Sequence, residues 1–287
     1  MKRFLILGAH GQLGVELQNT FHDAGQVIAL TRAACDLSNP SSICAAIQET
    51  HPDIILNAAA YTAVDRAESE PELAMRINGE APGILAEEAR KCGALLVHYS
   101  TDYVFDGAKS TPWVEEDPAH PLNVYGETKL AGEQNIQHAG EQYLIFRTSW
   151  VFSPRGNNFL LTMLRLGRER PQLRIVNDQK GAPTSTQALA SATRRIIESS
   201  TQVSGLYHMT CAGETTWYGF AQAIFAHARA NKPWASVIGI PSSEYPTPAR
   251  RPANSVLSNA KLKSTFGVEL PTWEPALETT LGEIQKC

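Results

Sequence analysis

The chain has 287 residues, which is enough for one large domain or two modest domains with a sizeable core. Hydrophobic residues make up 43% and charged residues 19%, a composition that excludes wholesale disorder. The net charge of −4 argues against broad nucleic-acid binding, although a local basic patch could still bind phosphate.

The apolar segments exclude two further classes of protein. The run Phe4–Leu7 follows Lys2 and Arg3, but it is far too short for a secretory signal peptide. No apolar run approaches the roughly 18 residues that a membrane span needs. The five cysteines form no CxxC pair and have no zinc-like spacing, which is typical of reduced thiols. The sequence therefore predicts a cytoplasmic protein.

Short apolar runs and helix-periodic segments alternate through the first half of the chain. We expect buried strands over 4–7, 27–30, 53–57, 95–97 and 143–146. We expect helices after Gly14, over 41–49, from Pro71 to about Lys91, and around Tyr125. This alternation predicts an α/β fold with a doubly wound, mainly parallel sheet of the Rossmann type.

After Arg147 the alternation becomes irregular, and prolines and glycines are more frequent. We therefore expect a dinucleotide-binding domain over 1–150 and a smaller, irregular α/β domain over 151–287 that mainly binds substrate. The strand-like residues 173–176 and the helix-periodic residues 187–197 are expected to return to the first domain, within a segment near 173–200.

A glycine pattern lies between the first expected strand and the helix that follows it. Gly8, Gly11 and Gly14 have GxxGxxG spacing, with Gln12 and Leu13 between the last two. Glycines permit a tight turn and a close approach of the backbone to a pyrophosphate, and the helix N-terminus offers free N–H groups to it. The pattern predicts a dinucleotide site.

The end of the second strand helps to choose the dinucleotide. An acidic residue there binds the ribose 2′-hydroxyl, whereas an arginine accommodates a 2′-phosphate. The chain has Arg32 at this place, which favours NADPH, with a solvated surface arginine as the alternative. Asp36 and Leu37 are expected beside the adenine, and the small residues 58–60 (Ala58, Ala59 and Ala60) let the cofactor come close.

Tyr125 and Lys129 are four residues apart, so they share one face of a helix. Ser100 and Thr101 follow a buried strand, and the carboxyl ends of such strands face the ligand cleft. A phenol, an ammonium and a hydroxyl that converge there would form a proton-donating group for carbonyl reduction. Lys129 would lower the pKa of Tyr125 from its usual value near 10, and Thr101 would hydrogen-bond the substrate oxygen.

Longer segments carry a resemblance that no single motif would establish. The chain resembles the extended short-chain dehydrogenase/reductase family, and more narrowly its members that reduce a dTDP-linked ketosugar. The segments that carry this resemblance span nearly the whole chain and are residues 57–65, 98–105, 124–133, 146–150, 156–159, 177–184 and 248–252.

The resemblance implies a reaction and a substrate. The C4 ketone of dTDP-4-dehydro-β-L-rhamnose would be reduced with NADPH, with NADH as the alternative, in the last step of dTDP-L-rhamnose synthesis for cell-surface polysaccharides. Tyr125 would donate the proton, and Lys129 would also hold the nicotinamide ribose. Tyr99 matches a cofactor-binding position. The positions that match the sugar site are Thr62, Val64, Thr101, Asp102, Tyr103 and Trp150.

The resemblance also suggests contacts to the nucleotide diphosphate. Asn157, Asn158, Arg250 and Arg251 match such positions, and guanidinium groups suit phosphate. The arginines could instead only bind a neighbouring carboxylate. Trp150 could likewise be a core aromatic residue rather than a flat apolar face for a deoxysugar.

Some members of the family resemble dimers joined by Mg²⁺ on glutamates. Glu16 and Glu283 match two of those positions, but the third is Gln187, whose amide is a poorer ligand for a hard cation. We therefore expect a monomer or a weak homodimer. The histidines show no metal-binding spacing, so no catalytic metal is expected, and His98 is interpreted as a satisfied strand residue.

Two other functions stay open at this point. An epimerase or dehydratase of the same fold would act on a sugar nucleotide and retain its cofactor, and Asp102 beside Thr101 would suit that chemistry. A non-catalytic, dinucleotide-binding regulatory subunit would tolerate the loss of Tyr125 and Lys129, but this chain has both residues.

Overall fold

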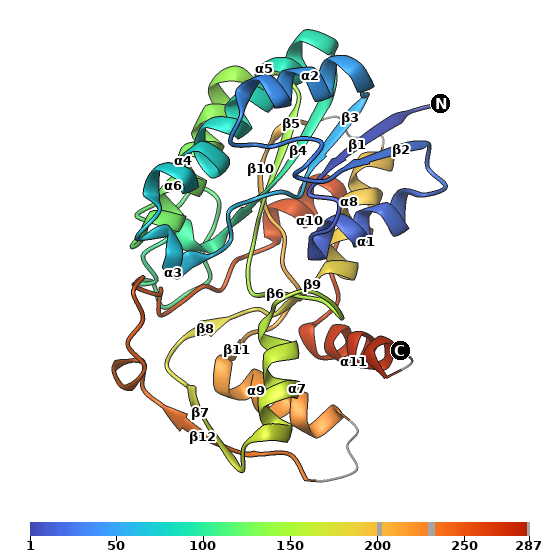
Figure 1. The fold of residues 1–287 in the computed structure, drawn as a ribbon. Helices are drawn as coiled ribbons and strands as arrows, with labels where there is room; N and C mark the ends of the chain where they lie inside the picture. Colours follow the sequence, from blue (N-terminus) through green and yellow to red (C-terminus); the bar gives the residue numbers. More distant parts are fainter. Residues whose placement is uncertain (200–202, 229–232, 286–287) are drawn as a thin grey trace.

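The computed structural model describes residues 1–199, 203–228 and 233–285 (Figure 1). Its centre is a six-stranded, all-parallel sheet with the strand order β10-β5-β4-β3-β1-β2. The strands are β1 (Arg3–Leu7), β2 (Gln26–Leu30), β3 (Ile54–Asn57), β4 (Leu95–Thr101), β5 (Tyr143–Thr148) and β10 (Gly205–His208). The predicted doubly wound, parallel α/β fold is confirmed. The order reverses between β1 and β3, where open sheets of this kind bind their ligands.

Helices cover both faces of this sheet, as Figure 1 shows. Successive strand residues point to opposite faces, so Leu5 and Leu7 of β1 pack in one core while Phe4 and Ile6 pack in the other. The helices that pack on the side of Leu5 include α2 (Pro40–Thr50), α5 (Ala81–Cys92) and α6 (Val124–Ala139). Those on the side of Phe4 include α1 (Gln12–Phe21), α8 (Thr186–Glu198) and α10 (Ala260–Phe266).

Local sequence signals set the ends of several helices. The Asn39 side chain caps α2 by accepting a hydrogen bond from the Ser41 N–H. Asn123 caps α6 in the same way through the Gly126 N–H, at 2.8 Å. Gly93 ends α5 in the left-handed conformation, with a φ of 71°. The Asn123 cap therefore sets the first residue of α6, the helix that carries Tyr125 and Lys129.

The expected helix from Pro71 to about Lys91 is a continuous helical segment of three parts. It consists of α4 (Pro71–Met75), a π-helical turn (Arg76–Glu80) and α5, and it follows the short helix α3 (Val64–Ala67). A proline at its start and a glycine beyond its end predicted the segment but not the π-helical turn, because these signals mark only the ends of a helix.

The second part of the chain, the described residues of 151–287 without α8, β10 and α10, lies beyond the carboxyl ends of the central strands (Figure 1). It contains small two-stranded pairings and three longer helices. The parallel pairs are β6 (Val151–Phe152) with β9 (Thr184–Ser185), and β7 (Gln172–Val176) with β12 (Ser236–Ile240). The antiparallel pair is β8 (Lys180–Gly181) with β11 (Thr215–Thr216). The helices are α7 (Phe159–Glu169), α9 (Trp217–His227) and α11 (Trp273–Ile284).

One expectation about the segment near 173–200 is wrong. The strand at 173–176 does not return to the central sheet, because β7 pairs with β12 in the second part of the molecule. Helix α8 does return, and it packs against α1. The sixth central strand is β10, which the irregular pattern of the second half did not reveal.

The structure also bears on the apolar segments and the cysteines noted in the sequence. None of the helices in the described residues is both long enough and apolar enough to cross a membrane. Four cysteines, Cys35, Cys44, Cys92 and Cys211, are present as free thiols. Cys287 lies outside the described residues.

Candidate active site

The glycine loop connects β1 to α1, and two of its positions leave no room for a side chain. Gly8 has a φ of 80°, and a Cβ on it would lie 2.9 Å from the Ala59 nitrogen. A Cβ on Gly14 would lie only 2.1 Å from the Gly8 carbonyl oxygen. Gly11 precedes α1 without a side-chain cap, so the first N–H groups of the helix are left for a ligand. This loop is a cradle for an anion such as a pyrophosphate.

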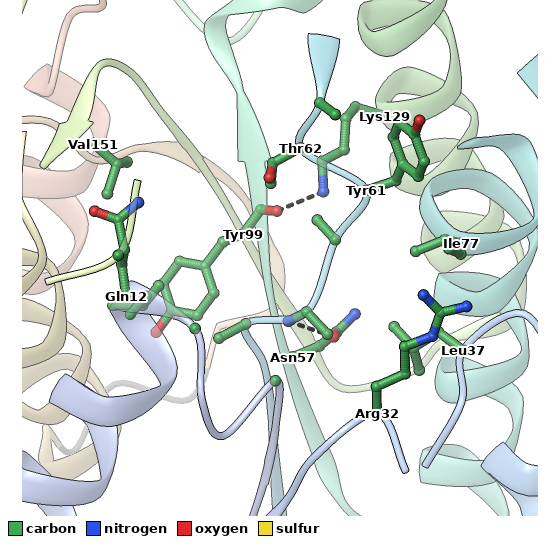
Figure 2. A pocket seen from close by; sticks show the side chains of 18 of the residues that line it. Gln12, Arg32, Leu37, Asn57, Tyr61, Thr62, Ile77, Tyr99, Lys129 and Val151 are labelled. Atoms are coloured by element: carbon green, nitrogen blue, oxygen red, sulfur yellow. Dashed lines mark hydrogen bonds between the residues drawn. The ribbon is translucent and has the colours of Figure 1, made fainter. Parts of the chain in front are cut away.

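A cavity of about 600 Å³ opens beside this loop at the carboxyl ends of the central strands. Figure 2 shows Arg32 and Leu37 toward one end of it and the Lys129 amine toward the other. All predicted cofactor residues except Gly14 line the cavity, and Gly14 packs against Gly8 instead. The lining residues of that set are Gly8, Gly11, Gln12, Leu13, Arg32, Asp36, Leu37, Ala58, Ala59, Ala60, Tyr99, Tyr125 and Lys129.

Arg32 and Asp36 lie together on the rim of this cavity. The Arg32 side chain is 72% exposed, and its Nε lies 3.7 Å from Asp36 Oδ2. Two hydrogen bonds from Ser38 and the nearby Arg32 hold the pKa of Asp36 below its usual value. The Arg32 guanidinium thus lies beside the cavity with a weak ion pair and stays mostly in solvent. It can contact a phosphate group of a ligand at the rim.

Gln12 links the glycine loop to the second part of the chain. Its Oε1 accepts hydrogen bonds from Ser153 Oγ at 3.0 Å and Asn158 Nδ2 at 2.8 Å, and its Nε2 donates to the Asn157 carbonyl at 3.3 Å. The Asn158 side-chain oxygen caps α7 through the Leu161 N–H. Asn157 lines the cavity, whereas the Asn158 side chain is engaged in these structural contacts.

Tyr125 lies in the first turn of α6, next to the end of β4. Although it lines an open cavity, the surrounding protein raises its pKa to about 12, an effect that a hydrogen bond with Thr101 opposes and the Asp102 charge increases. The expected effect of Lys129 on this pKa is not among these causes. The Tyr125 phenol is therefore protonated throughout the neutral range.

Thr101 and Asp102 form a buried polar pair behind this phenol. The Thr101 hydroxyl donates to Asp102 Oδ1 at 3.0 Å and accepts from the Tyr103 N–H at 3.2 Å. Burial raises the pKa of Asp102 to about 6. Its Oδ2 has no hydrogen-bond partner among the described residues. The carboxyl group beside the phenol therefore gains or loses its proton near pH 6 and is mostly ionised at pH 7.

Lys129 is only 1% exposed, although its nitrogen reaches the cavity. The nitrogen donates to the Tyr99 carbonyl at 2.7 Å, as the dashed line in Figure 2 shows, and lies 3.0 Å from His98 Nε2. Burial lowers the pKa of Lys129 to about 8, and the charge of Glu133 opposes this shift. Lys129 is mostly an ammonium at pH 7 and loses its charge above about pH 8.

A buried ion pair supports the back of the site. Glu133, one turn after Lys129 on α6, accepts from Arg147 Nε at 2.9 Å and from Arg147 Nη2 at 2.6 Å. It also accepts from the Ser100 hydroxyl. Both charged residues are at most 4% exposed. The pair fixes α6 against β4 and β5, the strands that carry Ser100 and Arg147.

The predicted sugar-binding residues are only partly brought together. Thr62 lines the cavity, and Val64 opens the short helix α3 beyond it. Tyr103 packs edge-on against Tyr125, with ring centroids 5.5 Å apart. Burial raises the pKa of Tyr103, so its phenol also stays protonated.

Trp150 does not line the cavity, and one face of its ring is already covered. It stacks on Trp217, with centroids 3.5 Å apart and an interplanar angle of 9°. Its backbone has a φ of 47°, which is uncommon for a bulky residue. A Cβ on Gly181 would lie 2.4 Å from the Trp150 ring, so the glycine permits this placement.

The two arginines of the segment 248–252 have different environments. Arg251 donates to Asp65 Oδ2 at 2.9 Å, and its guanidinium lies over the Tyr103 ring at 5.8 Å. For Arg251, the alternative of a neighbouring carboxylate is therefore the one observed. Arg250 is exposed, and its carbonyl accepts from Asn123 Nδ2 at 2.7 Å.

The positions that match the Mg²⁺ glutamates lie near one another, and Glu16 is also paired with an arginine. Glu16 lies 3.6 Å from Arg155. Burial and the charge of Glu283 raise the pKa of Glu16, so these two carboxyl groups influence one another. Gln187 shares a surface hollow with Glu16. In the described ranges, no three histidine, cysteine or acidic side chains converge as a metal site.

The polar residues of this region that sequence reasoning missed include His98, Asn57 and Thr148. His98 contacts Lys129, Asn57 lines the cavity and contacts His98 at 3.0 Å, and Thr148 lines the cavity beside Thr101 in the neighbouring strand. The Thr148 hydroxyl has no partner within the described part of the chain. Strand-end position was the available signal for Asn57 and Thr148, since both are the last residues of parallel strands.

The whole chain matches a known family. Residues 1–286 match the model described as the RmlD substrate binding domain. A dTDP-4-dehydrorhamnose reductase of Burkholderia thailandensis is 49% identical, over 96% of both chains. The enzyme of the same name from Escherichia coli K12 is 47% identical, over 98% of this chain and 97% of the relative.

Solved structures agree with these relatives. A dTDP-4-dehydrorhamnose reductase of Clostridium acetobutylicum superposes with a TM-score of 0.94 at 38% identity, over 99% of both chains. One from Bacillus anthracis, in complex with NADP, has a TM-score of 0.93 at 36% identity, over 98% of this chain and 99% of that one. A UDP-glucose 4-epimerase of Thermus thermophilus shares only the fold, with a TM-score of 0.82 at 21% identity.

The resemblance stated from the sequence segments is thus confirmed along the full length of the chain. The glycine loop and the pair Tyr125 and Lys129 line one cavity. The chain therefore belongs to the RmlD substrate-binding-domain family and is an NAD(P)H-dependent oxidoreductase.

Proposed function

We propose that the protein reduces the C4 ketone of dTDP-4-dehydro-β-L-rhamnose with NADPH and releases dTDP-β-L-rhamnose, the final step in making this sugar donor. The observation that carries the proposal is that the Tyr125 phenol and the Lys129 ammonium line the same cavity as the glycine loop. The relatives named for this reaction are up to 49% identical over nearly the full chain, which supports the choice of substrate.

The residues present fit a dinucleotide. Gly8 and Gly14 leave room that a Cβ would fill, and the uncapped start of α1 offers N–H donors to the pyrophosphate. Arg32, exposed on the rim, suits a 2′-phosphate and thereby NADPH. When bound, the cofactor supplies the hydride that the reduction needs.

Tyr125 is the proton donor in this proposal. With a pKa of about 12, it holds its proton at neutral pH and can give it to the alkoxide oxygen that forms at C4. Thr101, hydrogen-bonded to the phenol, would orient the ketone oxygen once its hydroxyl turns from Asp102 Oδ1 toward the substrate. The ammonium of Lys129, which lines the same cavity, binds the ribose of the cofactor; its charge is not among the causes of the Tyr125 pKa, so we assign it no part in stabilising the phenolate.

The two parts of the chain would share the substrate. We assign the dinucleotide to residues 1–150 and the sugar nucleotide mainly to 151–287, with Thr62, Val64, Thr101, Asp102 and Tyr103 contributing from the first part. The sugar would lie near these residues and Trp150, and the diphosphate near Asn157, Asn158 and Arg250. Arg251 would bind a phosphate only after its ion pair with Asp65 breaks. Trp150 would contact the sugar with the ring face that does not stack on Trp217.

We further propose a monomer or weak homodimer without a bridging metal. Glu16 already faces the Arg155 guanidinium, and the amide of Gln187 is a weak ligand for Mg²⁺. The sedimentation coefficient should be unchanged by EDTA, and a dimer that EDTA dissociates would contradict this assignment.

One assay separates the reductase from its alternatives. The purified protein is mixed with NADPH and with dTDP-4-dehydrorhamnose made in situ, and absorbance is followed at the reduced-nicotinamide band. Stoichiometric oxidation supports the reductase. Product without net oxidation would indicate an epimerase or dehydratase, and tight cofactor binding without turnover would indicate a regulatory subunit.

The Tyr125→Phe variant tests the proton donor. It should bind NADPH as the wild type does, while kcat falls by about 10²–10⁴-fold because general acid catalysis is lost. Fluorescence titration of the cofactor gives the control. A rate near that of the wild type would remove Tyr125 from this role.

A further inference from the structure

Three buried polar side chains form a hydrogen-bonded row beneath the cavity. Asn57, His98 and Lys129 are each 1% exposed. Asn57 Nδ2 lies 3.0 Å from His98 Nδ1, and His98 Nε2 lies 3.0 Å from Lys129 Nζ. They come from β3, β4 and α6, and Asn57 and His98 are direct partners in the register of the two strands. Asn57 and Lys129 line the cavity, and His98 lies between them.

Burial and the neighbouring Lys129 charge hold the pKa of His98 well below its usual value, so the ring is neutral. A neutral imidazole has one N–H and one acceptor nitrogen, whereas an ammonium only donates. Beside a charged Lys129, Nε2 must accept, and the ring proton must therefore be on Nδ1. That proton needs an acceptor on Asn57.

Asn57 can supply this acceptor if its amide turns by half a turn, which exchanges its oxygen and nitrogen. The exchange gives up the contact in which Asn57 Oδ1 accepts from the Ala59 N–H at 3.3 Å, and it leaves the Asn57 NH₂ facing that N–H, so the two donors must move apart. That contact is long and neutral, whereas the contact that the exchange completes involves a buried ammonium, and hydrogen bonds to charged groups are stronger. The balance favours a His98 ring protonated on Nδ1.

The consequence concerns the direction of the Lys129 N–H groups. Two of the three are directed at the Tyr99 carbonyl, at 2.7 Å, and at His98 Nε2. The third is left for the cavity, which Figure 2 shows beside the amine. Without His98, the nitrogen would have one fixed partner and could rotate about its stem.

We propose that His98 is a positioning residue for the reduction, which accepts a hydrogen bond from the Lys129 ammonium and directs its remaining N–H at the bound cofactor. The proposal rests on the proposed function, since only a reductase gives this N–H the ribose of a reducing cofactor to bind. It gives a role to a strand histidine that the sequence alone presented as a satisfied core residue.

Other charged or titratable groups also surround Lys129. Glu133 lies one turn later on α6 and forms an ion pair with Arg147 of β5, while Tyr125 lies one turn earlier on α6. Asp102, beyond the end of β4, faces Tyr125. None of these appears as a hydrogen-bond partner of the Lys129 nitrogen in the described residues, so the contact with His98 has no substitute.

Two amide variants separate positioning from packing. In His98→Gln, the amide reaches the place of Nε2 and can accept from Lys129, whereas in His98→Asn it reaches only the place of Nδ1 and faces Asn57. The pH profiles of kcat and kcat/KM are measured for both, with thermal melts to compare folding. His98→Asn should lose kcat by about tenfold or more, with the basic limb moved to lower pH. His98→Gln should stay within roughly threefold of the wild type.

The KM for the sugar should not move in either variant, since His98 does not touch the cavity. Equal losses in the two variants, or a His98→Asn enzyme with the wild-type rate and pH profile, would overturn the proposal.

A second measurement needs no substrate and keeps the two proposals distinguishable. In protein labelled with ¹⁵N-histidine, His98 should be neutral and carry its proton on Nδ1 at pH 7, and Lys129→Met should change its signal. A proton on Nε2 at this pH would overturn the role of His98 even if the wild-type enzyme turns over. A wild type without turnover would instead overturn the proposed function.

Discussion

The ion pair between Glu133 and Arg147 offers the sharpest test of how the site is supported. Glu133 is 1% exposed and Arg147 is 4% exposed. The carboxylate accepts two N–H bonds from the guanidinium, at 2.9 and 2.6 Å, while Arg147 Nη1 has no partner in the described residues. The variant Glu133→Gln keeps the shape of the side chain but removes its charge. Arg147 then remains as a buried cation without a counterion.

The expected cost follows from this uncompensated charge. Removing one partner of a buried pair typically costs about 3–5 kcal/mol, a large part of a total stability of about 5–15 kcal/mol. Unfolding entropies of about 2.1 cal/mol/K per residue give about 0.6 kcal/mol/K for a chain of 287 residues. The melting temperature of Glu133→Gln should therefore fall by about 5–8 °C.

Thermal and urea unfolding of three variants measure this effect. The matched control is Glu169→Gln, which breaks the exposed pair with Arg165 at 3.1 Å and should cost at most about 0.5 kcal/mol. The double variant Glu133→Leu/Arg147→Met removes both charges and should recover most of the loss. If Glu133→Gln melts within about 1 °C of the Glu169→Gln control, the pair is not what holds α6 against β4 and β5.

Three further predictions follow from single positions. Gly14→Ala should abolish NADPH binding in a fluorescence titration, because its Cβ would lie 2.1 Å from the Gly8 carbonyl oxygen, whereas the control Gly282→Ala, with nothing within 4 Å, should bind normally. The folded-state pKa of Asp102 is raised to about 6 from 3.8, so its contribution to stability is present below pH 3.8 and lost as pH rises through 6. Asp102→Asn should therefore stabilise the protein at pH 8, by up to about 3 kcal/mol, but not at pH 3.5, and equal urea midpoints at pH 8 would contradict this. Arg32→Ala should raise the KM for NADPH by about tenfold while leaving the KM for NADH unchanged, and parallel changes would show that Arg32 does not bind the 2′-phosphate.

Local sequence determined much of the fold and of the cofactor site. The first five strands, the helices around them and the glycine loop were predicted because each depends on neighbouring residues alone: apolar runs, helix caps and the spacing of Gly8, Gly11 and Gly14. Tyr125 and Lys129 were predicted to share a helix face for the same reason, since four residues make about one helical turn.

Contacts between distant residues were decided only by the tertiary structure. His98 reaches Lys129 across 31 positions, and Arg251 reaches Asp65 across 186, so no local pattern indicates either partner. The strand β7 has three apolar residues of five, yet it pairs with β12 and not with the central sheet, and Trp150 lies against Trp217 rather than in the cavity. The sequence by itself determined which residues could do the chemistry. Which of them meet was decided by packing, because side chains become neighbours only after strands and helices far apart in the chain bury their apolar faces together.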